Sequence, residues 1–116
     1  MRYLLVLLAA CLIAPAALAH AFLDRASPAV GSEISGSPPT LSLTYTEPVE
    51  PLFSSVEVTD ANGARVDQGK ATSQDDGRIL VVTLKPLQPG IYTVAWHVTS
   101  VDTHKTEGHF QFTVKP

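Results

Sequence analysis

Residues 91–98 read IYTVAWHV and residues 109–114 read HFQFTV, and these two stretches decide the fold. Both are rich in the β-branched and aromatic residues that favour strands. Large apolar side chains occupy every second position, so they share one face of an extended chain. They are Tyr92, Val94, Trp96 and Val98 in the first stretch, and Phe110, Phe112 and Val114 in the second. The alternation predicts two strands that each press one face into a core.

Shorter stretches before these two repeat the alternation and are separated by turn residues. Strands are predicted at 41–46 (LSLTYT), 54–59 (SSVEVT) and 78–84 (RILVVTL), with shorter ones near 21–25 and 65–66. Turns are predicted at 61–64 (ANGA), 75–77 (DDG) and 86–90 (PLQPG). About seven short strands in a chain of this size predict an all-β domain, a small Greek-key sandwich or barrel of the immunoglobulin-like kind.

Residues 1–19 have the pattern of a secretory signal peptide. Arg2 gives a positively charged start, residues 4–14 are almost wholly apolar, and a small-x-small cleavage signature ends at Ala19. We therefore expect cleavage after Ala19, export, and one folded domain over residues 20–116.

A second way of processing the leader is lipidation at Cys11, because LAAC (8–11) resembles a lipobox. The apolar run LIAPAALA (12–19) argues against it, since a lipoprotein usually has a polar tether at that point. No stretch reaches the roughly 20 apolar residues that span a bilayer, so we expect no membrane span.

Composition excludes several classes of partner and site. The chain has 8 basic and 11 acidic residues, a formal charge of −3, and no basic cluster, which argues against binding to nucleic acid. Its single cysteine, Cys11, and its single methionine, Met1, both lie in the leader. The mature domain, which we expect to be a monomer, would therefore have no thiolate or thioether ligand for a metal.

Cleavage after Ala19 would make His20 the first residue of the mature chain. An N-terminal histidine offers two nitrogens, the α-amine and Nδ1, which can chelate one metal ion. Elsewhere in a chain the backbone nitrogen is a non-basic amide. Taken alone, His20 could equally be an ordinary residue that follows a signal peptide.

Asp102 and His104 form a second candidate feature, two residues apart in SVDTHKTEGHF (100–110). In an extended segment their side chains would point to the same side. Together with the two nitrogens of His20 they make a three-nitrogen, one-oxygen set, which suits Cu(II). An Asp-x-His pair taken alone also fits a solvated loop.

The other polar candidates are weaker. We expect His97 and His109 to be surface or structural histidines rather than ligands. Glu47 and Glu50 flank a proline-rich turn, and Glu47 is the better placed to hydrogen-bond a ligand histidine or the α-amine. No nucleophile elbow, zincin helix or phosphate loop is present, so we expect no enzyme activity.

Three stretches together resemble the CopC family of periplasmic copper-resistance proteins: HAFLDRASPAVGS (20–32), LTYTEPVEPLFSSVEVTDANG (43–63) and WHVTSVDTHKTEGHFQFTV (96–114). The resemblance implies a small Greek-key β-domain that carries or buffers copper in the periplasm, for resistance and homeostasis. It implies a CopD-like inner-membrane copper transporter as a partner. The family's Cu(II) site matches His20, Asp102 and His104.

The sequence departs from the family pattern at two points. Thr103 and Lys105 stand where family members commonly have Gly and Pro. Some members also have a methionine-rich Cu(I) site, which this mature chain would lack. We therefore expect one Cu(II) ion per chain and no Cu(I) site.

Two other functions fit part of the pattern. A histidine-brace copper oxygenase also uses an N-terminal histidine, but Asp102 would fill the position that oxygen needs. A metal-free immunoglobulin-like interaction module would use neither His20 nor His104.

Overall fold

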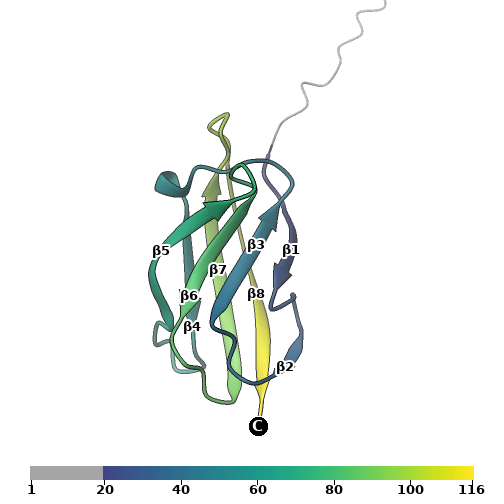
Figure 1. Cartoon of the computed structure of the whole chain (residues 1–116), viewed down its shortest axis with the longest axis vertical. Coiled ribbons are helices and arrows are strands. Elements are labelled where there is room, and N and C mark those ends of the chain that lie inside the picture. The colour runs from purple at the N-terminus through teal and green to yellow at the C-terminus, as the bar shows by residue number, and fades with distance from the viewer. Residues whose placement is uncertain (1–19) are drawn as a thin grey trace, which may run out of the picture.

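The computed structural model describes residues 20–116 as two four-stranded β-sheets packed face to face (Figure 1). The expected signal peptide, its cleavage after Ala19 and the alternative at Cys11 lie outside the described residues. Within residues 20–116 no helix is long and apolar enough to cross a membrane.

The strands are divided between the sheets in a way that confirms the all-β sandwich. One sheet has the order β1 (Leu23–Ser27), β3 (Thr40–Tyr45), β6 (Ile79–Leu84), β5 (Asp67–Gln74). The other has the order β2 (Glu33–Ser35), β8 (Lys105–Lys115), β7 (Gly90–Thr99), β4 (Ser55–Thr59). A short 3-10 helix, η1 (Pro51–Phe53), joins β3 to β4 across the sandwich.

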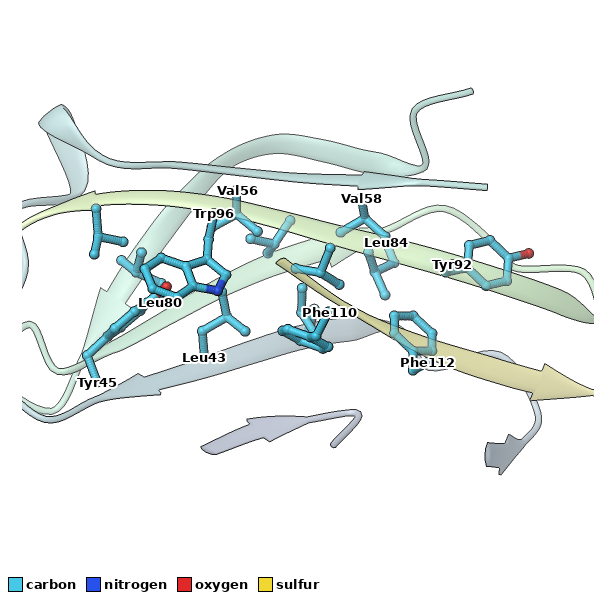
Figure 2. Packing of buried hydrophobic residues seen from close by; sticks show 14 of the residues in the cluster. Leu43, Tyr45, Val56, Val58, Leu80, Leu84, Tyr92, Trp96, Phe110 and Phe112 are labelled. Atoms are coloured by element: carbon cyan, nitrogen blue, oxygen red, sulfur yellow. The ribbon is translucent and has the colours of Figure 1, made fainter. Parts of the chain in front are cut away.

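The core lies between the sheets and is built from the alternating side chains of the strands. All seven apolar residues that the two deciding stretches place on one face are buried. Tyr45 meets Trp96 edge-on at a ring-centroid distance of 5.3 Å, and Tyr92 stacks on Phe112 at 5.5 Å (Figure 2). The first pair joins the two sheets, and the second pair links β7 to β8 within one sheet. Both fill the core, because aromatic side chains bury large apolar areas.

Two strands differ from the sequence-based expectation. β5 runs over Asp67–Gln74, where only a short strand near 65–66 was expected, because β5 is a largely exposed strand without apolar alternation. The expected turn at 61–64 is present, and Thr59 bridges to Arg65 as a short hairpin. The chain then crosses to the other sheet, where β5 pairs with β6.

Other strand boundaries are also different. β8 begins at Lys105, four residues before the expected start, and pairs with every residue of β7. β1 begins at Leu23 rather than Ala21. The three-residue β2, which runs parallel to β8, had no signal in the sequence and brings the strand count to eight rather than about seven.

Gly108 lies opposite Trp96 in the β7–β8 ladder, on the core side of β8. A Cβ atom at position 108 would come within 2.5 Å of Trp96 Cζ2 and 2.8 Å of Cε2. The indole therefore occupies the space that a side chain at 108 would need. Only glycine lets this large ring lie flat against the neighbouring strand.

Asp67 stabilises the segment in which the chain crosses from β4 in one sheet to β5 in the other. Its buried carboxylate accepts hydrogen bonds from Arg65 Nε at 2.8 Å and Nη2 at 2.7 Å, and from the Val58 amide at 2.8 Å. Burial acts to raise the pKa of Asp67, but the bonds from Arg65 and Val58 prevail and lower the pKa below its usual range. The ionised carboxylate thus ties β4 to the start of β5.

Gly108→Ala should destabilise the fold by about 1–3 kcal/mol, because the added methyl group overpacks the core against Trp96. Urea unfolding followed by Trp96 fluorescence measures the loss. Gln111→Ala, on the solvent side of the same strand, is the control and should change stability by no more than about 0.5 kcal/mol. Equal stability of Gly108→Ala and wild type would contradict the packing described.

Asp67→Asn should lower the free energy of unfolding at pH 7 by about 1.5–3 kcal/mol, because charge-assisted hydrogen bonds are lost. A carboxyl whose folded pKa is depressed stabilises above its unfolded pKa and ceases to do so as pH falls through the folded value. The difference between variant and wild type should therefore shrink below about pH 4. Urea titrations at several pH values measure it.

The matched control for Asp67→Asn is Glu57→Gln, since Glu57 makes only an exposed contact of 3.3 Å with Arg65. Its effect should stay below about 1 kcal/mol at every pH. A loss for Asp67→Asn that is as large at pH 3 as at pH 7 would show that the carboxylate charge is not what stabilises this crossing.

Candidate metal centre

The segment His20–Phe22 is held at the end of the sandwich by Thr46, which directly follows β3, and by Thr106 of β8 in the other sheet. The Thr46 amide donates to Phe22 O at 2.9 Å, and the Phe22 amide donates to Thr46 Oγ1 at 3.0 Å. Thr106 Oγ1 donates to Ala21 O at 2.6 Å, and Ala21 is fully buried. His20 is therefore held by its neighbours at a defined place beside the β7–β8 hairpin.

Residues 100–104 form the turn of that hairpin, which Figure 1 shows at the same end of the sandwich as the start of the described chain. The Ser100 amide donates to His104 O at 2.8 Å, and the Thr103 amide donates to Ser100 O at 2.8 Å. Ser100 is also bridged to Val49, which follows β3. The turn is thus fixed internally and against the opposite sheet.

These two fastened segments bring His20 and His104 together. Their ring centroids are 4.8 Å apart, with an angle of 49° between the ring planes. The ring of Phe22 lies 5.9 Å from that of His20 on the solvent side of the segment, where the Phe22 side chain is exposed. Two of the three sequence-predicted ligands are therefore direct neighbours, although they are far apart in the chain.

Asp102, the third predicted ligand, lies against His104. Its Oδ1 is 3.2 Å from His104 Nδ1, and it accepts a short hydrogen bond from the Ser100 hydroxyl. The Ser100 bond, followed by the neighbouring His104 imidazole, lowers the pKa of Asp102. The carboxylate is therefore ionised at neutral pH, which is the form that binds a metal.

His104 Nδ1 has an unusual environment. The nitrogen is shielded from solvent and, despite the nearby Asp102 oxygen, no contact has the geometry of a hydrogen bond. Buried polar atoms in proteins nearly always have a partner. An imidazole nitrogen and a carboxylate oxygen are both metal-ligating atoms, and here they lie 3.2 Å apart with no hydrogen bond joining them.

The described residues do not yet form a closed coordination sphere. Among residues 20–116 no three His, Cys, Asp or Glu side chains are gathered around one point as placed. The Glu47 carboxylate makes none of the hydrogen bonds or ion pairs found in this part of the chain. What the end of the sandwich offers is a pair of imidazoles with an adjoining carboxylate.

His97 and His109 lie away from this cluster. Both are exposed on the outer face of the β7–β8 sheet, and His97 Nε2 is 2.8 Å from Glu107 Oε2. This agrees with the expectation of surface histidines. Three residues that position the cluster, Thr46, Ser100 and Thr106, were not singled out from the sequence, because a hydroxyl that fastens a distant segment has no local signature.

The geometric reason given for pairing Asp102 with His104 was wrong. Residues 101–103 form a turn rather than an extended segment, and Thr103 has a left-handed backbone with φ of 73°. The two side chains meet because the turn folds around Ser100. A β-branched residue is strained in this conformation, which glycine adopts freely.

Residues 23–115 match the CopC domain. The chain belongs to the CopC family. It is 38% identical over 117 residues to Protein YobA of Escherichia coli (strain K12), with 99% of this chain and 94% of that protein covered. It is 36% identical over 117 residues to Copper resistance protein C of Xanthomonas campestris pv. juglandis, with 95% and 91% covered.

Solved structures give the same assignment. The crystal structure of CopC from Methylosinus trichosporium OB3b has a TM-score of 0.78 to this chain at 37% identity, with 84% of this chain and 95% of that chain covered. CopC proteins bind copper and confer copper resistance, and they are not enzymes. The family therefore decides against both the oxygenase and the metal-free module.

A longer relative places the same domain in a larger protein. Copper transport protein CutJ of Bacillus subtilis (strain 168) is 31% identical over 114 residues. The match takes in 97% of this chain but 21% of CutJ. A CopC-like domain is thus a minor part of a longer chain that is named for copper transport.

Thr103→Gly should stabilise the domain by about 1 kcal/mol, because the strain of a left-handed β-branched residue exceeds the extra entropy that glycine loses on folding. Thr72→Gly, an exposed position within β5, is the control and should destabilise by about 0.5–1 kcal/mol. Chemical denaturation of both variants measures the two signs. A loss of stability in Thr103→Gly would show that the turn is not strained.

Proposed function

We propose that the chain is an exported periplasmic Cu(II) carrier or buffer in copper homeostasis and resistance, and that it binds one Cu(II) ion per mature chain at the N-terminal centre. The ligands are the α-amine and imidazole of His20, the carboxylate of Asp102 and the imidazole of His104. Signal cleavage after Ala19 creates the site, because the uncleaved chain has an amide where the amine is needed.

The contact between the His20 and His104 rings, at 4.8 Å, is the observation that carries this proposal. The unpartnered His104 Nδ1 and the ionised Asp102 beside it add to its support. Two imidazoles, an amine and a carboxylate form a nitrogen and oxygen set that suits Cu(II), and divalent affinities peak at copper.

The fastened N-terminal segment favours binding. Ala21 is buried and bonded to Thr106, and Phe22 is bonded to Thr46, so His20 has little freedom left to lose when the metal binds. Glu47 follows Thr46 directly and is our candidate to hydrogen-bond the α-amine or a ligand imidazole.

The composition supports Cu(II) alone as cargo. Cu(I) prefers thiolate and thioether ligands, and the only cysteine and methionine of the chain precede His20. We propose that no Cu(I) site is present in the mature domain. Copper would then leave the protein as Cu(II).

We propose a CopD-like inner-membrane copper transporter as the partner and a monomer as the working form. Support for the partner comes from CutJ, in which a related domain belongs to a longer copper transport protein. A separate domain and a membrane transporter could perform together what one longer chain does.

The decisive test is native mass spectrometry and Cu(II) titration of protein exported with its own leader. We expect a mass that begins at His20 and gains one tightly held copper. One alanine added before His20 should weaken binding by well over tenfold, because it replaces the chelating amine with an amide. One alanine added after Pro116 is the matched control and should change nothing.

Single substitutions extend this test. His20→Ala, His104→Ala and Asp102→Asn should each weaken Cu(II) binding, and the two histidine variants should change the nitrogen pattern in the electron paramagnetic resonance spectrum. A lipidated mass beginning at Cys11 would contradict the processing proposed. Tight binding that survives the alanine added before His20 would exclude the amine as a ligand.

A further inference from the structure

We propose a second Cu(II) site, formed by His97, Glu107 and His109 on the outer face of the β7–β8 sheet. It uses none of the residues of the N-terminal centre. Its ligands are two imidazoles and a carboxylate, a set that binds first-row divalent metals and, by the general affinity order, copper most tightly.

The strand register places the three side chains together. His97 of β7 is paired with Glu107 of β8, and Ala95 is paired with His109 one step further along the same face. Residues 107 and 109 point to the same side of β8 and lie about 7 Å apart along the strand. All three side chains are exposed, which separates them from the core-facing positions of the same two strands.

Two of the three ligands already touch. His97 Nε2 lies 2.8 Å from Glu107 Oε2, and their side chains are 63% and 72% exposed. An exposed pair of this kind adds little to stability, because water and salt screen the attraction between surface charges. The fold therefore does not depend on this ion pair, and both side chains can move to bind an ion with little loss of stability.

The surface between the ligands is a shallow, open depression. It has a volume of about 790 Å³ and is lined by Thr93, Ala95, His97, Glu107, Gly108 and His109. The small Ala95 lies directly beside His109, so no bulky side chain fills the space between the two imidazoles. Rotation of the exposed His109 side chain toward the His97–Glu107 pair would complete a three-ligand site, with water filling the remaining positions.

The charged side chains around this proposed site leave room for a bound cation. On the β4 side the nearest carboxylate, Glu57, is paired with Ala95 in register and contacts Arg65 at 3.3 Å. On the β8 side Lys105 precedes Glu107 on the same face, and among the described residues it forms no ion pair with Glu107. The lysine and the open surface make this site weaker than a chelating N-terminus, so it would fill second.

The two copper sites lie on opposite sides of β8. Thr106, which fastens Ala21, points inward, whereas Glu107 and His109 point outward. Each site can therefore be removed without disturbing the other. A second, more exposed site would let the protein hold additional copper once the N-terminal centre is full.

The test is a Cu(II) titration of the mature protein to two equivalents, with native mass spectrometry for stoichiometry and amide NMR for location. We expect two bound ions and paramagnetic broadening first around residues 20–22 and 100–104, then around 95–97 and 107–109. His97→Ala, Glu107→Gln and His109→Ala should each lose the second ion and keep the first. Gln111→Ala, on the same face, should keep both.

His20→Ala separates this proposal from the proposed function, because it should lose the first ion and keep the one at His97, Glu107 and His109. If His20→Ala still binds two ions, the N-terminal site is wrong, and the outer site stands only if His97→Ala removes one of the two ions. If wild type binds one ion only, or if the second ion persists in all three outer-face variants, the outer site is overturned.

Discussion

The pairing of β7 with β8 is the constraint on which the rest of the structure depends. The ladder is continuous from Gly90 opposite Val114 to Thr99 opposite Lys105. It presents the aromatic side chains of both strands to the core, and it can close around Trp96 only because Gly108 has no side chain. The same ladder ends at the turn that holds Asp102 and His104, so core packing and the candidate metal centre share one scaffold.

The candidate centre also needs a closure over a long stretch of sequence. His20 lies at the start of the described chain and His104 near its end, and their rings meet because Thr106 and Thr46 hold Ala21 and Phe22 from opposite sheets. Closing such a loop is entropically unfavourable in the unfolded chain, and the folded sandwich offsets that cost before any metal arrives. The position of His20 is therefore a property of the whole fold rather than of its own neighbourhood.

The parts of this architecture that depend on alternating apolar residues could be predicted from the sequence. Trp96, Phe110 and Phe112 are each buried as their spacing required. β5 and β2 could not be predicted, because one is a largely exposed polar strand and the other is three residues long. Both form strands because they hydrogen-bond to a neighbouring strand, and that partner cannot be identified from the residues of the strand itself.

For the candidate site, too, one part could be predicted from the sequence and another could not. Donor chemistry and the family resemblance predicted His20, Asp102 and His104 as one ligand set. The structure places His104 beside both His20 and Asp102, while the ligand set itself stays a prediction. How they come together did not follow, because an extended chain was assumed where Thr103 turns with a positive φ. The hydroxyls of Ser100 and Thr106 were missed because a serine or threonine that fastens a distant segment resembles any other.

The exposure of the proposed copper site bears on how copper could be handed on. The side chains of His104 and Asp102 are 42% and 41% exposed, so incoming ligands from a partner could approach the edge of the site from the solvent side, although His104 Nδ1 itself is shielded. A buried site would hold copper more securely but would need part of the fold to open before release. Here the anchors, Thr46 and Thr106, hold the backbone of Ala21 and Phe22 rather than the ligand side chains. A partner could therefore replace the ligands one at a time while the sandwich stays closed, as a carrier or buffer requires.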